Sequence, residues 1–505
     1  MLSKILSGCV VGLDGILIEV EVDVAEKGFP TFTIVGLPDK SVDEAKDRVR
    51  TAIVNTGFEM PDSRITVNLA PADIPKEGSA FDLPIAIGIL VSSKLILADS
   101  IQNSLFIGEL SLKGDIRPVA GIISILMMAQ EKHISTIYLP FDNVEEARFF
   151  DKITIFPIKK LSDLILYLNK HTVLLPLTPQ KVEFKKDEVF DSDFCDIKGQ
   201  ELVKRALEIA AAGFHNTHLK GPPGAGKTLI SRAFPSILPP MDMNELLDVW
   251  RIYSVIGLLH KKSFTNIRPF RSPHHTASRI GLIGGGGNPR PGEISLAHRG
   301  VLFLDEFPEF PRSVLEALRQ PLEDGFVTVS RAMGSITFPS RFLLLAASNP
   351  CPCGYLGHPK KPCSCMPGII LRYRKRLSGP LLDRIDLHVD VPSVQEDKLT
   401  DKNLGERSCK VRERVMIARE RQKKRLHHTE ILTNGEMSSK LIRQCCNLND
   451  DADQILKQAI DRFSLSARSY FKIIKIAQTI ADLAGKDRIE RSHITESLQF
   501  RLHEE

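Results

Sequence analysis

The residues of this chain best suited to chemistry lie at 221–228, where spaced glycines precede a lysine and a threonine. In this spacing, glycines let backbone N–H groups close around a phosphate, the lysine reaches the terminal phosphate oxygens, and the threonine hydroxyl binds Mg²⁺. The start of the following helix favours an anion as well. We therefore expect ATP and Mg²⁺ to be bound by a loop made of Gly221, Pro222, Pro223, Gly224, Ala225, Gly226, Lys227 and Thr228.

Two adjacent carboxylates, Asp305 and Glu306, end an apolar run at 301–304. An uninterrupted apolar run is typical of a strand buried in the centre of a parallel sheet. At the carboxyl end of such a strand, Asp305 is placed to hold Mg²⁺ through water, and Glu306 to orient the water that attacks ATP. The alternative is a core strand that ends in a solvated acidic turn. The phosphate loop upstream favours the catalytic interpretation, because two motifs in order rarely occur by chance.

A second apolar run ends in Asn349, the position of which resembles the sensor-1 asparagine of AAA+ ATPases. The segment around Arg384 looks like the arginine-finger segment of the same superfamily. An arginine supplied by a neighbouring subunit stabilises the charge that builds on the transferred phosphoryl group, so the resemblance implies assembly into a ring. The alternative for Arg384 is a surface ion pair with Asp383 or Asp386.

Three more segments, 268–278, 349–354 and 466–468, narrow the resemblance. On these residues the chain is identified as a member of the magnesium-chelatase-like AAA+ family, and it resembles the ComM/YifB branch over essentially its whole length. The resemblance implies a hexameric ring helicase that uses ATP to promote branch migration during homologous recombination in natural transformation. It also implies single-stranded and branched DNA as partners, together with the recombinase machinery.

The resemblance also assigns roles at the two ends of the predicted core. Arg468 resembles the family's sensor-2 arginine, which would touch a nucleotide phosphate. Whether it acts in its own subunit or in a neighbour stays open at this point. The segment 196–200 resembles the one that packs against adenine, which assigns Ile197 and Gln200 to the base.

Basic residues in two loops are the candidates for DNA contacts. Two short strands at 324–330 and 336–338 resemble the pre-sensor-1 hairpin of AAA+ helicases, and Arg331 at its tip is the first candidate for a phosphate contact. Arg290 follows a glycine run that looks like the helix-2 insert, a loop expected at the pore of a ring. Such a run mainly indicates a mobile loop, and a plain connector is the alternative. The basic helix expected at 411–425 contains glutamates and is interpreted as a solvated face.

Four cysteines, Cys351, Cys353, Cys363 and Cys365, form two Cys-x-Cys pairs. Four soft ligands close in sequence suit tetrahedral zinc, so structural Zn²⁺ is the favoured interpretation. The spacing is tighter than usual, and His358 is a candidate to replace one thiolate. The alternative is a pair of reduced, solvent-facing turns without metal.

The N-terminal region contains two segments, 75–80 and 108–121, that resemble the protease domain of Lon. Peptide hydrolysis in that family needs a serine activated by a lysine. Here Ile123 occupies the lysine position, and Ser79 lies one residue away from the position of the nucleophile. An isoleucine cannot accept a proton, so we expect a Lon-like fold that is not proteolytic.

Length and composition bound the architecture. At 505 residues the chain exceeds the size of a single core, which stops growing near about 250–300 residues. The sequence predicts an α/β protein with a Lon-protease-like α+β domain at 1–170, a linker at 171–195, an AAA+ core with a parallel sheet at 196–391 and a helical lid domain at 392–505. A net charge of +5 is too small to indicate DNA binding by itself, so any DNA site must be a local patch.

Targeting and redox signals favour the cytoplasm. The segment Leu6 to Cys9 superficially resembles a lipoprotein cleavage box, but it lacks the preceding apolar stretch of a secretory signal. No apolar run is long enough to predict a membrane span. Nine cysteines, an odd number, argue against a disulfide framework.

Three functions stay open at this level. The first is the branch-migrating DNA motor, supported by the resemblance. The second is a chelatase-type ATPase that remodels a protein partner, which fold analogy does not separate from the first. The third is an ATP-dependent protease, against which Ile123 argues.

Overall fold

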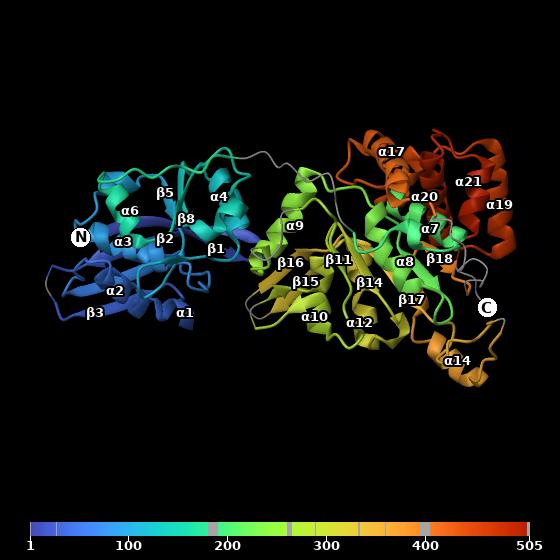
Figure 1. Ribbon diagram of the computed structural model, residues 1–505, viewed down its shortest axis with the longest axis horizontal. Helices are drawn as coiled ribbons and strands as arrows, with labels where there is room; N and C mark the ends of the chain where they lie inside the picture. Colours follow the sequence, from blue (N-terminus) through green and yellow to red (C-terminus); the bar gives the residue numbers. More distant parts are fainter. Residues whose placement is uncertain are drawn as a thin grey trace. The chain divides into compact units, whose positions relative to one another are not determined.

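The computed structural model describes residues 2–26, 28–179, 190–259, 265–287, 289–331, 334–358, 360–393 and 405–501 (Figure 1). The chain divides into two compact units, which are described separately. The first comprises Met1–Phe184 and Leu247–Thr265, and the second comprises Lys185–Leu246 and Asn266–Glu505. Both mix helices and strands, so the expected α/β class is confirmed.

The first unit is built on a mixed seven-stranded sheet with the order β3-β4-β2-β1-β5-β8-β9. The pairs β1–β2 and β2–β4 are antiparallel, and the other neighbours are parallel. The strands are β1 (Leu2–Val11), β2 (Asp14–Val24), β3 (Thr31–Val35), β4 (Arg64–Ala70), β5 (Ser104–Phe106), β8 (Thr136–Pro140) and β9 (Thr154–Ile158). A small ladder joins β6 (Glu109–Leu110) to β7 (Ile116–Arg117).

The helices of this unit cover the sheet with apolar side chains. All the residues of α3 are buried, which is expected of a helix that is apolar all round. The helices are α1 (Lys40–Asp43), α2 (Ala45–Asn55), α3 (Asp82–Ser92), α4 (Ile122–Glu131), α5 (Val144–Ala147) and α6 (Leu161–Leu168). The C-terminal part of α9 (Met243–Val255) is counted with this unit as well.

In the first hairpin, buried residues alternate with partly buried ones along β2 from Ile18 to Val24. Asp14 and Gly15 lie just after the turn of this hairpin. These residues pair within the strand, and Gly12 and Leu13 make the turn, with Gly12 at φ 66°. Gly15 has a different reason to be glycine, since a Cβ there would lie 2.3 Å from the carbonyl oxygen of Ser124 in α4. Helix packing, and not chain reversal, therefore requires a glycine at position 15.

The second unit contains a parallel five-stranded sheet with the order β11-β14-β17-β10-β18. The strands are β10 (Thr217–Lys220), β11 (Phe270–Arg271), β14 (Val301–Leu304), β17 (Leu343–Ser348) and β18 (Leu387–Asp390). Every residue of β14 and β17 is buried, which explains their uninterrupted apolar sequence. Because the strands are parallel, the loops that follow β10, β14 and β17 meet at one edge of the sheet.

Helices surround this sheet and continue into a C-terminal helical bundle, drawn in orange and red in Figure 1. Around the sheet lie α7 (Glu201–Gly213), α8 (Lys227–Ala233), α10 (Arg279–Ile283), α11 (Glu293–Leu296), α12 (Arg312–Ala317), α13 (Arg319–Asp324), α14 (Pro367–Arg374) and α15 (Gly379–Leu382). The bundle consists of α17 (Ser408–Leu426), α18 (Ser439–Cys445), α19 (Asp450–Phe463), α20 (Ala467–Leu483) and α21 (Arg491–Leu498). Buried Ile476 and Ile480 of α20 join the core that α7 forms with the sheet.

Two hairpins project from the second unit. One pairs β15 (Phe326–Arg331) with β16 (Gly334–Pro339), as the sequence predicts. The other pairs β12 (Gly284–Gly285) with β13 (Arg290–Pro291), so the first two glycines of the run lie in a ladder and not in a plain connector. Over the residues that the structure describes, no helix combines the length and apolarity that crossing a bilayer requires.

Candidate active site

The phosphate-binding loop follows β10 and leads into α8. Gly224 and Gly226 have φ angles of 78° and 84°, a left-handed conformation that glycine adopts without strain. The Nζ of Lys227 donates to the carbonyl oxygens of Gly221 and Pro222 at 2.7 and 2.9 Å. Burial lowers the pKa of Lys227, and the nearby charge of Asp305 opposes that shift. The lysine is thus held inside the loop, where a phosphate would be bound.

Thr228 and Asp305 meet at the edge of the sheet. The Thr228 hydroxyl donates to Oδ2 of Asp305 at 2.7 Å, and the backbone N–H of Glu306 donates to Oδ1 of Asp305 at 2.9 Å. A hydroxyl and a carboxylate at this spacing are hard oxygen donors of the kind that Mg²⁺ prefers. The residues present therefore fit a magnesium ion bound with a nucleotide.

Glu306 lies at the end of β14 with its side chain about half exposed. Its φ of 51° places it in the left-handed region, which is uncommon for a residue with a side chain. Its carboxylate lies 3.1 Å from Nδ1 of His275, in the segment that follows β11. The sequence motif contained His275, but nothing in it indicated this pairing, because the contact joins two neighbouring strands of the sheet.

Asn349 comes directly after β17, and its Oδ1 accepts a hydrogen bond from Nζ of Lys227 at 3.1 Å. The predicted sensor residue and the loop lysine are therefore in contact. Beside Asn349 lies a cavity of about 360 Å³, lined also by His218, Tyr373 and Leu377. Burial lowers the pKa of His218 to about 4, so its ring is neutral when it bonds the Ser348 hydroxyl at 2.8 Å.

The residues assigned to adenine lie where α7 begins. Ile197 is buried, and Gln200 adopts φ 60° as the residue that caps the helix. The amide nitrogen of Gln200 donates to the Pro392 carbonyl at 2.7 Å, whereas its Oε1 is buried without a hydrogen-bond partner among the described residues. A buried, unpaired acceptor is costly. An amino group of a nucleobase would satisfy it, so these residues fit an adenine nucleotide.

Arg384 and Arg468 lie together, on opposite sides of one carboxylate. The guanidinium of Arg384 bonds Oε2 of Glu323, and that of Arg468 lies 3.8 Å from Oε1 of the same residue. Both arginines line a cavity of about 380 Å³ whose described lining contains no residue of 221–228. The partner of Arg384 is thus Glu323, which neither the finger motif nor the alternative of Asp383 or Asp386 had suggested.

The candidate DNA contacts are placed only in part. Arg290 is exposed in the β12–β13 hairpin. Arg331 ends β15, opposite Gly334, and its side chain lies outside the described residues.

The basic residues of α17 are largely used within the protein. Arg414 pairs with Glu208 and Glu406, and Arg425 pairs with Asp482. Arg419 donates to the carbonyl oxygen of Ala211. The prediction that this helix presents a solvated face is therefore wrong for these arginines, because carboxylates and carbonyls distant in sequence fold against them.

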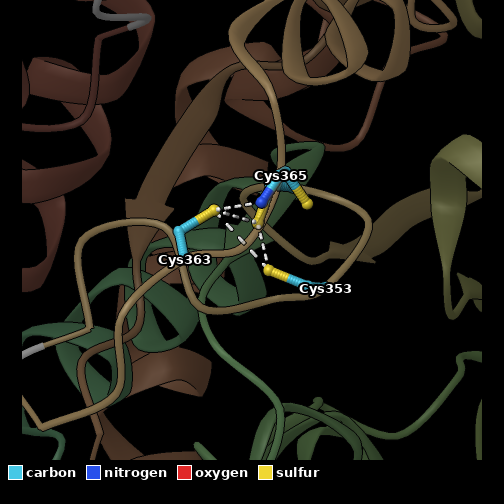
Figure 2. A group of neighbouring side chains, drawn as sticks. Cys353, Cys363 and Cys365 are labelled. Carbon is cyan, nitrogen blue, oxygen red and sulfur yellow. Dashed lines mark hydrogen bonds between the residues drawn. The ribbon is translucent and has the colours of Figure 1, made fainter.

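The four cysteines come together in the segment that follows Asn349. All four ligand atoms lie within 4.8 Å of one another. The Sγ atoms of Cys351, Cys353 and Cys363 are 3.4, 3.7 and 3.6 Å apart in their three pairs, and Figure 2 shows Cys353 and Cys363 turned toward one another. Backbone N–H groups of Tyr355 and then Ser364 lower the pKa of Cys353 to about 5. All nine cysteines of the chain are unpaired in the structure.

The structure also places the N-terminal residues whose sequence resembles the protease domain of Lon. Ile123 is fully buried in α4. The hydroxyl of Ser79 bonds Glu109, and buried Lys76 donates to the carbonyl oxygen of Pro71. These contacts give neither serine nor lysine the partner that peptide hydrolysis requires.

The parallel sheet, the phosphate loop and the acidic strand end define a P-loop ATPase of the AAA+ class. Comparisons with known proteins agree. Residues 193–399 match the family described as magnesium chelatase, subunit ChlI, residues 20–143 match subunit ChlI of Mg-chelatase, and residues 405–501 match the ChlI C-terminal family.

Full-length relatives narrow the family further. Competence protein ComM of Haemophilus influenzae is 43% identical over 509 residues, covering 99% of this chain and 97% of that protein. The YifB protein of Escherichia coli K12 is 42% identical, with the same coverage of both chains. Magnesium-chelatase subunit ChlI of Euglena gracilis is 22% identical and covers 56% of this chain and 88% of that protein. The chain belongs to the magnesium-chelatase-like ComM/YifB family.

Proposed function

We propose that this AAA+ ATPase is a DNA motor, a hexameric ring helicase that promotes branch migration during homologous recombination in natural transformation. The ATPase activity is supported by two hydrogen bonds, Lys227–Asn349 and Thr228–Asp305. They join the loops that follow three neighbouring strands at one edge of the sheet. The competence role rests on the name and the near full-length similarity of the Haemophilus relative.

The chemistry follows from which atoms these residues present. Lys227 and the N–H groups of the glycine loop bind the β and γ phosphates, and Asn349 orients the γ phosphate. Thr228 and Asp305 hold Mg²⁺, which supplies positive charge to the phosphate oxygens when it is bound. Glu306 leaves His275 and accepts a hydrogen bond from the attacking water, which it orients.

The position of the remaining two arginines supports assembly into a ring. Arg384 and Arg468 share Glu323 and line a cavity without their own phosphate loop. An arginine that stabilises the transition state must reach the γ phosphate. We therefore propose that both act on the nucleotide of the neighbouring subunit, which makes the assembled ring the active form.

DNA is proposed to contact the two hairpins, with Arg290 and Arg331 reaching phosphates in the pore. Each lost phosphate contact should weaken binding and flatten its salt dependence. Arg331→Ala and Arg290→Ala are expected to lower DNA affinity and DNA-stimulated ATP turnover. ATP turnover without DNA, measured alongside, separates the loss of a DNA contact from damage to the nucleotide site. Unchanged DNA binding in both variants would contradict these contacts.

The decisive assay for the motor is migration of a Holliday junction and displacement of a strand. Wild-type protein is expected to perform at least one of them with ATP, while Lys227→Ala and Glu306→Gln perform neither. ATP hydrolysis and DNA binding without displacement or migration on any substrate would contradict the helicase. It would favour a chelatase-type ATPase that remodels a protein partner, a second candidate that the ChlI family match supports.

Two further assignments complete the proposal. We propose Zn²⁺ as the occupant of the four-cysteine cluster, because four thiolates are a donor set typical of structural zinc. We also propose a cytoplasmic location, in contact with the recombinase machinery, consistent with nine unpaired thiols.

A further inference from the structure

The four-cysteine cluster lies against the nucleotide site. Cys351 is fully buried and only Pro350 separates it from Asn349. Gly354, in the same segment, packs on the phosphate loop, since a Cβ at this position would lie 2.5 Å from Cδ of Pro223. The cluster therefore connects to the site twice, through the chain to Asn349 and through packing to Pro223.

The sulfur positions fit one tetrahedral ion. A zinc ion with four Zn–S bonds of about 2.3 Å holds its sulfurs about 3.8 Å apart. The measured separations of 3.4, 3.7 and 3.6 Å among Cys351, Cys353 and Cys363 approach that value, and Cys365 lies within 4.8 Å of the other ligand atoms. A disulfide needs about 2.05 Å between sulfurs, so these thiols are not disulfide-bonded, and their spacing fits a shared metal ion.

We propose that zinc in this cluster positions Asn349 against the phosphate loop, so that ATP hydrolysis depends on the zinc although zinc takes no part in the chemistry. The proposal rests on the ATPase function proposed above. Without the ion, the four thiolates have no common partner. The two Cys-x-Cys pairs are then no longer held together. Asn349 and Pro223 would then lose the support on one side of the site.

The expected defect is one of positioning and not of nucleotide binding. The phosphates are held by the backbone of the phosphate loop and by Lys227. The cysteine cluster contributes no group that binds them. A small displacement of an orienting group costs about tenfold to hundredfold in rate. Zinc removal should thus lower kcat by at least about tenfold and change the dissociation constant of ATP much less.

The first test measures metal and hydrolysis on the same full-length samples. Reduced wild-type protein is expected to contain an equimolar amount of zinc, and Cys353→Ser and Cys363→Ser to contain little. These variants should bind a fluorescent ATP analogue, keep the wild-type circular dichroism spectrum and lose kcat. Cys409→Ser, an exposed cysteine outside the cluster, should match wild type in every measurement. Zinc near zero in wild type, or wild-type kcat in a zinc-free variant, would overturn the proposal.

The second test leaves the ligands untouched, and so stays decisive if the cysteine variants do not fold. Gly354→Ala pushes a methyl group against Pro223, whereas Gly357→Ala in the same segment has a similar positive φ and no atom within 4 Å. Both should retain zinc, and only Gly354→Ala should lose kcat. Equal kcat in the two variants would contradict the coupling. Wild-type protein that binds zinc and never hydrolyses ATP would instead contradict the proposed ATPase.

Discussion

Arg384 and Arg468 are joined through a single carboxylate, that of Glu323, although they come from two separate parts of the chain. Arg384 follows α15 and Arg468 begins α20, in the C-terminal helical bundle. The side chain of Arg384 is only 15% exposed, and its Nη1 also donates to the carbonyl oxygen of Pro380 at 2.7 Å. The sheet-containing core and the helical bundle therefore each contribute one arginine to the same carboxylate. A movement of the core or of the bundle should therefore displace both arginines.

Glu323 is expected to orient these arginines. Glu323→Gln removes the charge that fixes both guanidinium groups, so kcat for ATP should fall by about tenfold while nucleotide affinity stays near that of wild type. Glu316→Gln is the matched control, because Glu316 pairs with Arg319 on an adjacent turn and not with the two arginines. Wild-type kcat in Glu323→Gln would show that the shared carboxylate does not orient them.

Glu306 should separate binding from hydrolysis. Glu306→Gln keeps the shape of the side chain but removes the base, and a positioned base contributes about 10²-fold or more to rate. The variant should bind ATP with the affinity of wild type and hydrolyse it at least about 100-fold more slowly. Isothermal titration with a non-hydrolysable ATP analogue, combined with phosphate release, checks both parts. Fast hydrolysis by this variant would place the base elsewhere.

His275 should restrain Glu306. Its Nδ1 lies 3.1 Å from the carboxylate, which is therefore not free to orient water. His275→Ala is expected to raise ATP turnover measured without DNA by about tenfold to hundredfold, since a hydrogen bond to a charged group contributes about 1.5–3 kcal/mol. His427→Ala, an exposed histidine of the C-terminal region, serves as the control. Lower turnover in His275→Ala would mean that the histidine assists Glu306 instead.

Acid should destabilise the second unit through His218. Burial lowers its pKa from 6.5 to about 4 in the folded protein, so the unfolded chain binds more protons between these values. The stabilisation is complete above pH 6.5 and is lost as the pH falls toward 4. The stability lost between pH 7 and pH 5 amounts to about 2 kcal/mol. His218→Gln should reduce the fall in Tm between pH 7 and 5, and an identical fall in both proteins would contradict this assignment.

The parts of the fold and site that sequence predicts are those set by local pattern. The phosphate loop, the apolar strand before Asp305 and the β15–β16 hairpin each depend on residues close in sequence. Glu323 escaped prediction because no motif marks it and its partners lie far along the chain. The requirement for glycine at position 15 is equally invisible in the local sequence, because it comes from the packing of α4 against β2.

Shared catalysis between neighbouring subunits is the central claim, and co-expression of Lys227→Ala with Arg384→Ala tests it most directly. Each variant alone should be inactive. Lys227→Ala lacks the lysine of the phosphate loop, and Arg384→Ala lacks the arginine. In a randomly mixed ring, about a quarter of the seams combine an intact loop with an intact arginine. ATP hydrolysis in the mixture well above that of either variant is the predicted result. Activity no greater than the average of the two variants, or full activity of Arg384→Ala alone, would contradict the account.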